Sequence, residues 1–98
     1  MAYTKHGRVT SQVVATPTQV VSYSLPVSKV LFQALRSNTG FVVIGGRNVR
    51  ASSGEQNGVS LAVPATSTPQ MQEFTNVNLM DLYIDVTVAN EGVAYVYE

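Results

Sequence analysis

The amino-acid sequence predicts an all-β protein: a small antiparallel β-sandwich or jelly-roll-like domain with an extended N-terminal segment. Valine is the commonest residue, with 17 copies against six leucines and two isoleucines, and β-branched side chains favour strands over helices. Glycine, asparagine, serine and proline recur at short intervals, as they do between the short strands of sandwiches and barrels. The nearest approach to a helix, Val30–Arg36, is short and runs into the hairpin-like loop Ser37–Gly40.

The turn residues divide the chain into short strands. In chain order we expect strands at Arg8–Ala15, Gln19–Ser24, Lys29–Arg36, Phe41–Ile44, Val59–Val63, Met71–Phe74, Leu82–Ala89 and Val93–Tyr97. The last two are expected to pair as a hairpin around Asn90–Gly92, with the glycine at positive φ. Gly45–Gly46 follows a strand but lacks the Gly-Lys-Ser/Thr of a phosphate loop, which favours a bulge or sharp corner there.

The chain is short enough, at 98 residues, to form one domain around one core. Residues 1–28 contain Pro17 and Pro26, and prolines belong near sheet edges. We therefore expect an N-terminal arm or edge strands over residues 1–28 and a β-sandwich core over residues 29–98. The arm is the expected main anchor to a partner, so deletion of residues 1–15 is expected to abolish binding and leave a folded domain.

Charge is segregated along the chain although the net charge is zero. All six cations lie at positions 5 to 50 and all six anions at positions 55 to 98. This pattern is typical of two halves that pair across strands in one sheet system. An alternative is a molecule with a positive and a negative pole that docks on a charged neighbour.

Composition and spacing argue against several function classes. The chain is 45% hydrophobic and only 12% charged, without cysteine, which excludes a disordered chain, a coiled coil and a thiolate metal site. Six scattered cations do not make a nucleic-acid-binding stripe, and no apolar run approaches the roughly 18 residues that span a bilayer. The N-terminus lacks the apolar core of a secretory signal.

We expect no enzyme activity, no catalytic or metal-binding residue and no cofactor. The single histidine, His6, stands in a polar segment near the chain start, where chains tend to fray and a catalytic histidine would lack support. Asp81 and Asp85 have the residue type of a glycosidase acid–base pair, but strand alternation places both on a solvated face. A protein interface is the remaining kind of site, and its expected residues are Tyr3, Lys5, Arg8, Arg47, Arg50, Tyr83, Tyr95 and Tyr97. Tyr83, Tyr95 and Tyr97 are expected to share one face of the terminal hairpin, since tyrosine is common at interfaces.

Residues 29–98 resemble small virion proteins of tailed bacteriophages. The resemblance is carried, in order, by Val30–Phe32, Phe41–Val49, Asn57–Leu61, Asn78–Ile84 and Val93–Tyr97. These follow a pattern of a strand leading to V-x-I-G-G-x-N-V, a G-x-x-L segment, an L-x-x-[IL]-Y strand and a terminal hairpin. The chain departs from the pattern at Pro64–Thr66, where P-G-x-S is expected, and residues 1–28 are unmatched.

The resemblance implies a β-sandwich component of a virion, assembled in the cytoplasm of a bacterial host, and it transfers no catalytic residue. The expected function is a capsid decoration or cement protein that binds the major capsid protein or another virion protein. A neck, tail or fibre component is an alternative. A carbohydrate-binding or receptor-binding β-sandwich module is a second, and the oligomeric state, including a homo-oligomer, stays open.

Overall fold

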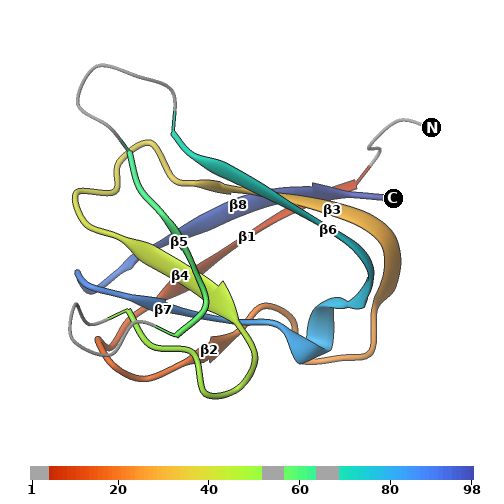
Figure 1. The fold of residues 1–98 in the computed structure, drawn as a ribbon, viewed down its shortest axis with the longest axis horizontal. Helices are drawn as coiled ribbons and strands as arrows, with labels where there is room; N and C mark the ends of the chain where they lie inside the picture. The colour runs from red at the N-terminus through yellow and green to blue at the C-terminus, as the bar shows by residue number, and fades with distance from the viewer. Residues whose placement is uncertain (1–4, 52–56, 64–68) are drawn as a thin grey trace.

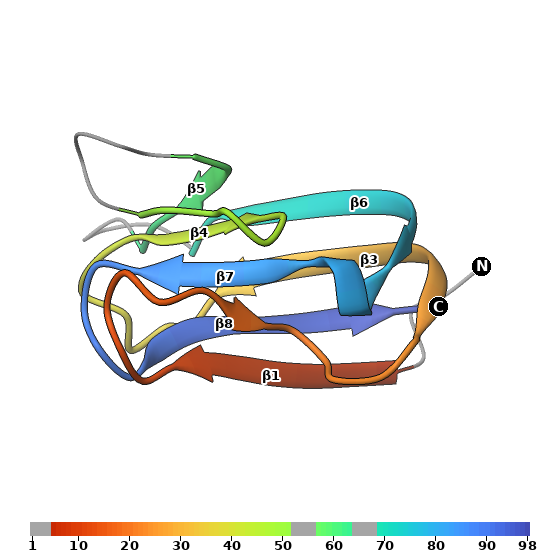
Figure 2. The ribbon, with the colours of Figure 1, turned by 90° about the horizontal axis from the view of Figure 1, so that it is seen from below.

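The computed structural model describes residues 5–51, 57–63 and 69–98. Eight strands and one short 3-10 helix follow one another along these residues. The strands are β1 (Lys5–Ser11), β2 (Thr18–Gln19), β3 (Pro26–Ala34), β4 (Val42–Gly45), β5 (Val59–Leu61), β6 (Met71–Asn78), β7 (Tyr83–Val86) and β8 (Glu91–Tyr97), with η1 (Leu79–Asp81) between β6 and β7. They form two four-stranded sheets (Figures 1 and 2): sheet I in the order β1-β8-β3-β6 and sheet II in the order β2-β7-β4-β5.

The topology is that of a chain folded in half and then rolled up. β1 pairs with β8, β2 with β7, β3 with β6 and β4 with β5, always antiparallel. Alternate pairs fall into opposite sheets, and β3–β8 and β4–β7 contacts complete each sheet. This is the eight-stranded jelly roll, so the predicted all-β sandwich of jelly-roll type is confirmed. The cation-rich first half therefore pairs strand for strand with the anion-rich second half, as the first interpretation of the charge pattern expects.

The core lies between the two sheets. Val30 and Phe32 from β3 and Val93 from β8 face Ile44 and Ile84 from sheet II, and all five side chains are completely buried. Phe32 is the largest of these, and its ring contacts Phe74 edge-on and Tyr95 at a tilt, with ring centroids 5.7 and 5.5 Å apart. Alternation along each strand thus places every second side chain in one shared apolar layer.

The predicted C-terminal hairpin is wrong. β7 belongs to sheet II and β8 to sheet I, so the chain crosses between sheets at Thr87–Asn90. Sequence alternation identifies a buried face but does not identify the strand that pairs beside it, which depends on long-range contacts. Asn90 has positive φ, at 69°. Gly92 does not; it is needed because a side chain there would overlap the Val9 carbonyl of β1.

The N-terminal segment is built into both sheets. Residues 5–11 form the edge strand of sheet I through seven residue pairs with β8, and residues 18–19 form an edge of sheet II. The boundary expected between residues 28 and 29 falls inside β3, which begins at Pro26. Val9 packs on the core and Ser11 is fully buried, so deletion of residues 1–15 would remove core contacts as well as an edge.

The outer face of sheet II is covered by the chain itself. β4 ends at Gly45, and the Val49 N–H donates to the Gly46 carbonyl at 3.0 Å, which confirms the sharp corner predicted at Gly45–Gly46. Val49 and Ala51 then pack on Val43, which is 1% exposed. The predicted solvated position of Asp85 is wrong. This carboxylate is 1% exposed beneath the same segment and accepts the Ala51 N–H at 2.8 Å.

Candidate functional site

Three loops at one end of the sandwich carry exposed apolar side chains. Seven large apolar side chains are exposed within the described residues, and four of them lie in these loops: Val13 (59%), Val14 (45%), Phe41 (53%) and Val88 (40%). Both views place the β1–β2, β3–β4 and β7–β8 loops together at the end opposite the start of β1 and the end of β8 (Figures 1 and 2). We call this surface the loop tip, formed by residues 12–16, 37–41 and 87–90.

The loop tip carries no charged residue. Residues 12–16 fall in the uncharged stretch between Arg8 and Lys29, and residues 37–41 fall between Arg36 and Arg47. Residues 87–90 lie between Asp85 and Glu91, and both of these anions are buried. Loops are normally the polar, solvated part of a fold, and a grouped set of exposed apolar side chains is typical of an interaction surface.

The buried carboxylate of Glu91 holds the β3–β4 loop of the loop tip in place. Glu91, the first residue of β8, accepts hydrogen bonds from the Thr39 N–H at 2.7 Å, the Thr39 hydroxyl at 2.9 Å and the Gly40 N–H at 2.9 Å. Burial favours the neutral acid, but the three donors together outweigh it, and the pKa of Glu91 is lowered from its ordinary 4.5. The carboxylate is therefore held ionised at neutral pH, where it fixes the backbone directly before Phe41.

Further hydrogen bonds join all three loops. The Asn38 amide donates to the Gly92 carbonyl at 2.8 Å, and the Phe41 N–H donates to the Thr87 hydroxyl at 2.9 Å. The Asn90 N–H donates to the Ser11 carbonyl at 2.8 Å, which ties the β7–β8 loop to the end of β1. The apolar side chains of the tip thus stand on a preorganised backbone, which lowers the entropy cost of binding.

The predicted tyrosine face does not exist. Tyr95 is 8% exposed and packs in the core, and Tyr97 lies beside it with ring centroids 6.0 Å apart. Burial, followed by the nearness of Tyr97 and Tyr23, raises the pKa of the Tyr95 hydroxyl. Tyr83 lies in the other sheet, packed against Val43 and its neighbours.

The predicted basic interface residues lie on separate surfaces. Lys5 and Arg8 are exposed on β1 of sheet I. Arg47 is exposed at the corner after β4, where it lines a polar depression with Asp81 and Tyr83. Arg50 is half-buried, and its guanidinium donates to the Val49 carbonyl at 2.8 Å. The seven expected interface residues that the structure describes therefore do not form one surface. The eighth, Tyr3, lies outside the described residues.

The histidine and the aspartates considered as catalytic residues lie apart in the described part of the chain. His6 is exposed on β1, and Asp81 is exposed while Asp85 is buried, so the two aspartates do not share a site. Within residues 5–51, 57–63 and 69–98, acidic and histidine side chains nowhere gather in threes as metal ligands would. In the same ranges, no helix has the length and apolarity to cross a bilayer.

Sequence reasoning missed the loop tip. The available signals are the adjacent Val13 and Val14 before Pro17 and the lack of charge in all three loops. Phe41 and Val88 follow strand alternation in the sequence and are therefore assigned to strands. Only the fold shows that these positions meet at one end.

Comparison with known proteins adds no relative. No family model, no curated protein and no solved structure matches the chain.

Proposed function

We propose that this protein is a structural, non-enzymatic binding module that attaches to a larger protein assembly through its loop tip. The role that best fits is decoration of a bacteriophage capsid, with the major capsid protein or another virion protein as the partner. The observation that carries the proposal is the set of four exposed apolar side chains on loops that Glu91, Asn38 and Ser11 hold in place.

The size of the apolar surface fits a part that acts in many copies. Complete burial of an exposed valine or phenylalanine contributes about 1.5–3 kcal/mol, so four half-exposed side chains contribute about 4 kcal/mol. Taken alone this corresponds to a dissociation constant of about 1 mM. Useful occupancy then needs further contacts around the tip or many sites on one lattice, as a capsid shell provides.

The jelly-roll fold supports the proposed capsid role by analogy with other jelly-roll domains. Eight-stranded jelly rolls are frequent among viral capsid and lectin domains, and a fold by itself does not decide function. An exposed cluster of tyrosines would favour the carbohydrate-binding alternative, but Tyr95 lies in the core. A neck, tail or fibre location uses the same kind of surface and differs from decoration chiefly in copy number.

The test compares binding of matched variants to assembled particles. Val88→Asp places a carboxylate in the loop tip. Val59→Asp makes the same change at a similarly exposed position, 37% against 40%, on β5, where Val59 pairs with Ile44 near the end of β4 that is remote from the loop tip. We expect Val88→Asp to lose particle binding and Val59→Asp to retain it, with both variants folded by circular dichroism. Equal binding by the two variants would refute the role of the tip.

Copy number on purified particles separates the two virion locations. Quantitative mass spectrometry is expected to find this chain in numbers on the order of the capsid subunits, because decoration follows the shell lattice. A number limited to the symmetry of one vertex would instead indicate a neck or tail part. Binding of the isolated domain to glycans, without binding to particles, would contradict both.

A further inference from the structure

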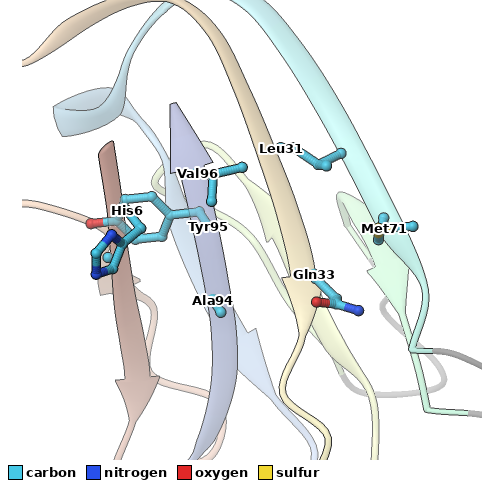
Figure 3. Close-up of a pocket in the computed structure, with 8 residues that line it drawn as sticks. His6, Leu31, Gln33, Met71, Ala94, Tyr95 and Val96 are labelled. Atoms are coloured by element: carbon cyan, nitrogen blue, oxygen red, sulfur yellow. The ribbon is translucent and has the colours of Figure 1, made fainter. Parts of the chain in front are cut away.

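The outer face of sheet I is open, in contrast to that of sheet II. Sheet II is covered by residues 46–51, which bury Val43 and Asp85. On sheet I the outward side chains of the two central strands are Leu31 and Gln33 of β3 and Ala94 and Val96 of β8. With Met71 of β6, which is 53% exposed, they line a mostly apolar depression of about 180 Å³ (Figure 3).

The register of the sheet arranges this face in rows across the strands. One row is His6, Val96, Leu31 and Glu73, and the next is Arg8, Ala94, Gln33 and Met71. On the other side of the first row, Lys29 stands next to Glu98, whose N–H donates to the Lys29 carbonyl at 3.1 Å. The two central strands thus carry the apolar strip, with His6 and the cation Arg8 at the β1 edge and the anion Glu73 at the β6 edge.

We infer that the outer face of sheet I binds the same face of a second copy of this chain. The proposed two-fold axis runs parallel to the strands between β8 and β3. Such an axis exchanges the two edges of the sheet and keeps each row in place, so it sets His6 opposite Glu73 of the second copy and Val96 opposite its Leu31. In the row that contains Lys29, it sets Lys29 opposite the Glu98 of the second copy.

The charge pattern selects this axis over the other two-fold arrangement. An in-plane axis perpendicular to the strands would place β1 over β1 and β6 over β6. Where that axis crosses the strands at a row, it brings Arg8 against Arg8, Glu73 against Glu73 or Lys29 against Lys29, and like charges across an interface oppose association. Where it crosses between two rows, it brings no pair of opposite charges together. The parallel axis instead sets Lys29 of each copy opposite Glu98 of the other, and it brings neither Arg8 nor Glu73 against a side chain of the same charge.

The area of the face indicates a weak dimer. Four strands about 4.8 Å apart and about seven residues long at about 3.4 Å each give a footprint of roughly 450 Å² per copy. Two copies then bury on the order of 1,000 Å², at the small end of specific interfaces. Association is therefore expected at micromolar concentrations or above. The loop tip lies at the end of the sandwich and stays accessible in the dimer.

Sedimentation velocity of the full chain over a concentration series tests the inference. We expect a monomer–dimer equilibrium that Met71→Lys and Glu73→Lys each weaken at least tenfold. Asp81→Lys is the matched control, since it makes a similar charge reversal at an exposed position of η1. The double variant His6→Glu with Glu73→Lys places opposite charges at these two facing positions, and it is expected to restore the dimer.

Three results would overturn the inference. A chain that remains monomeric throughout the series has no such interface. A dimer that Val88→Asp disrupts and Met71→Lys does not is held through the loop tip. If the double variant His6→Glu with Glu73→Lys is folded by thermal melting and does not restore the dimer, the proposed axis is refuted. Particle binding by Met71→Lys reports on the loop tip separately, so the two proposals fail independently.

Discussion

The hydrogen bonds around Glu91 allow the loop tip to be perturbed from within. Glu91→Gln keeps the size and shape of the side chain and removes its charge. The carboxylate accepts Gly40 through one oxygen and both donors of Thr39 through the other. A glutamine has one acceptor oxygen, so its amide nitrogen must face at least one N–H donor of the loop.

The expected loss in the free energy of unfolding follows from the number of hydrogen-bond donors that Glu91→Gln leaves without an acceptor. Leaving a buried or half-buried donor without a partner costs about 1–3 kcal/mol, and the remaining bonds lose their charge assistance. We expect Glu91→Gln to lower the free energy of unfolding by about 2–3 kcal/mol. For a domain of this size, that shift lowers the melting temperature by about 10–20 °C. Particle binding should fall as well, because the Thr39–Gly40 backbone supports Phe41.

The pH dependence of stability gives a second, independent signature. The pKa of Glu91 is lower in the folded protein than its ordinary 4.5, so the unfolded chain takes up the proton first as pH falls. The stabilisation by Glu91 is therefore complete above about pH 5 and is lost as pH falls through the folded pKa. The difference between the wild-type protein and Glu91→Gln should narrow in that acid range.

Chemical denaturation between pH 3 and pH 7 measures both effects, with Asp81→Asn as the control. Asp81 is exposed, so its variant should stay within about 0.5 kcal/mol of the wild-type protein. A Glu91→Gln variant as stable as the wild-type protein at pH 7 would refute the structural role of this carboxylate. A difference that does not change with pH would show that the lost stability comes from packing and not from the ionised group.

Three further predictions concern the core and the N-terminal strand. Gly7→Ala should cost about 1–3 kcal/mol by overpacking, because the new methyl group would lie 2.5–2.9 Å from the Tyr95 ring and hydroxyl; in a Tyr95→Leu background the cost should nearly vanish in a double-mutant cycle. Phe32→Ala should cost about 3–5 kcal/mol in urea denaturation, and a cost below 1 kcal/mol would contradict its central place between Phe74 and Tyr95. Deletion of residues 1–15 should yield an unfolded or aggregating chain by circular dichroism and light scattering, because it removes β1 and exposes the edge of β8; a soluble, cooperatively melting product would show that β1 is dispensable.

Local properties of the chain decide its fold class. The excess of valine and the spacing of turn residues make strands, and they act within a few residues of themselves. Strand existence was therefore predictable at β3, β4, β7 and β8, and so was the corner at Gly45–Gly46. The segregation of cations and anions into two halves also reflects a real feature, since the first four strands pair with the last four.

The tertiary structure decides which strands are neighbours and which side chains reach solvent. Asp85 looks solvated by alternation, yet residues 49–51 return over it, and Tyr95 looks like an interface residue, yet the missing side chain of Gly7 gives its ring room in the core. Val13, Phe41 and Val88 are separated by up to 75 positions in the chain and meet only because successive strands cross between the sheets. The alternation of apolar and polar residues indicates the two faces of a single strand. The position of the loop tip depends instead on contacts between segments that are distant in the sequence, and these cannot be predicted from local sequence.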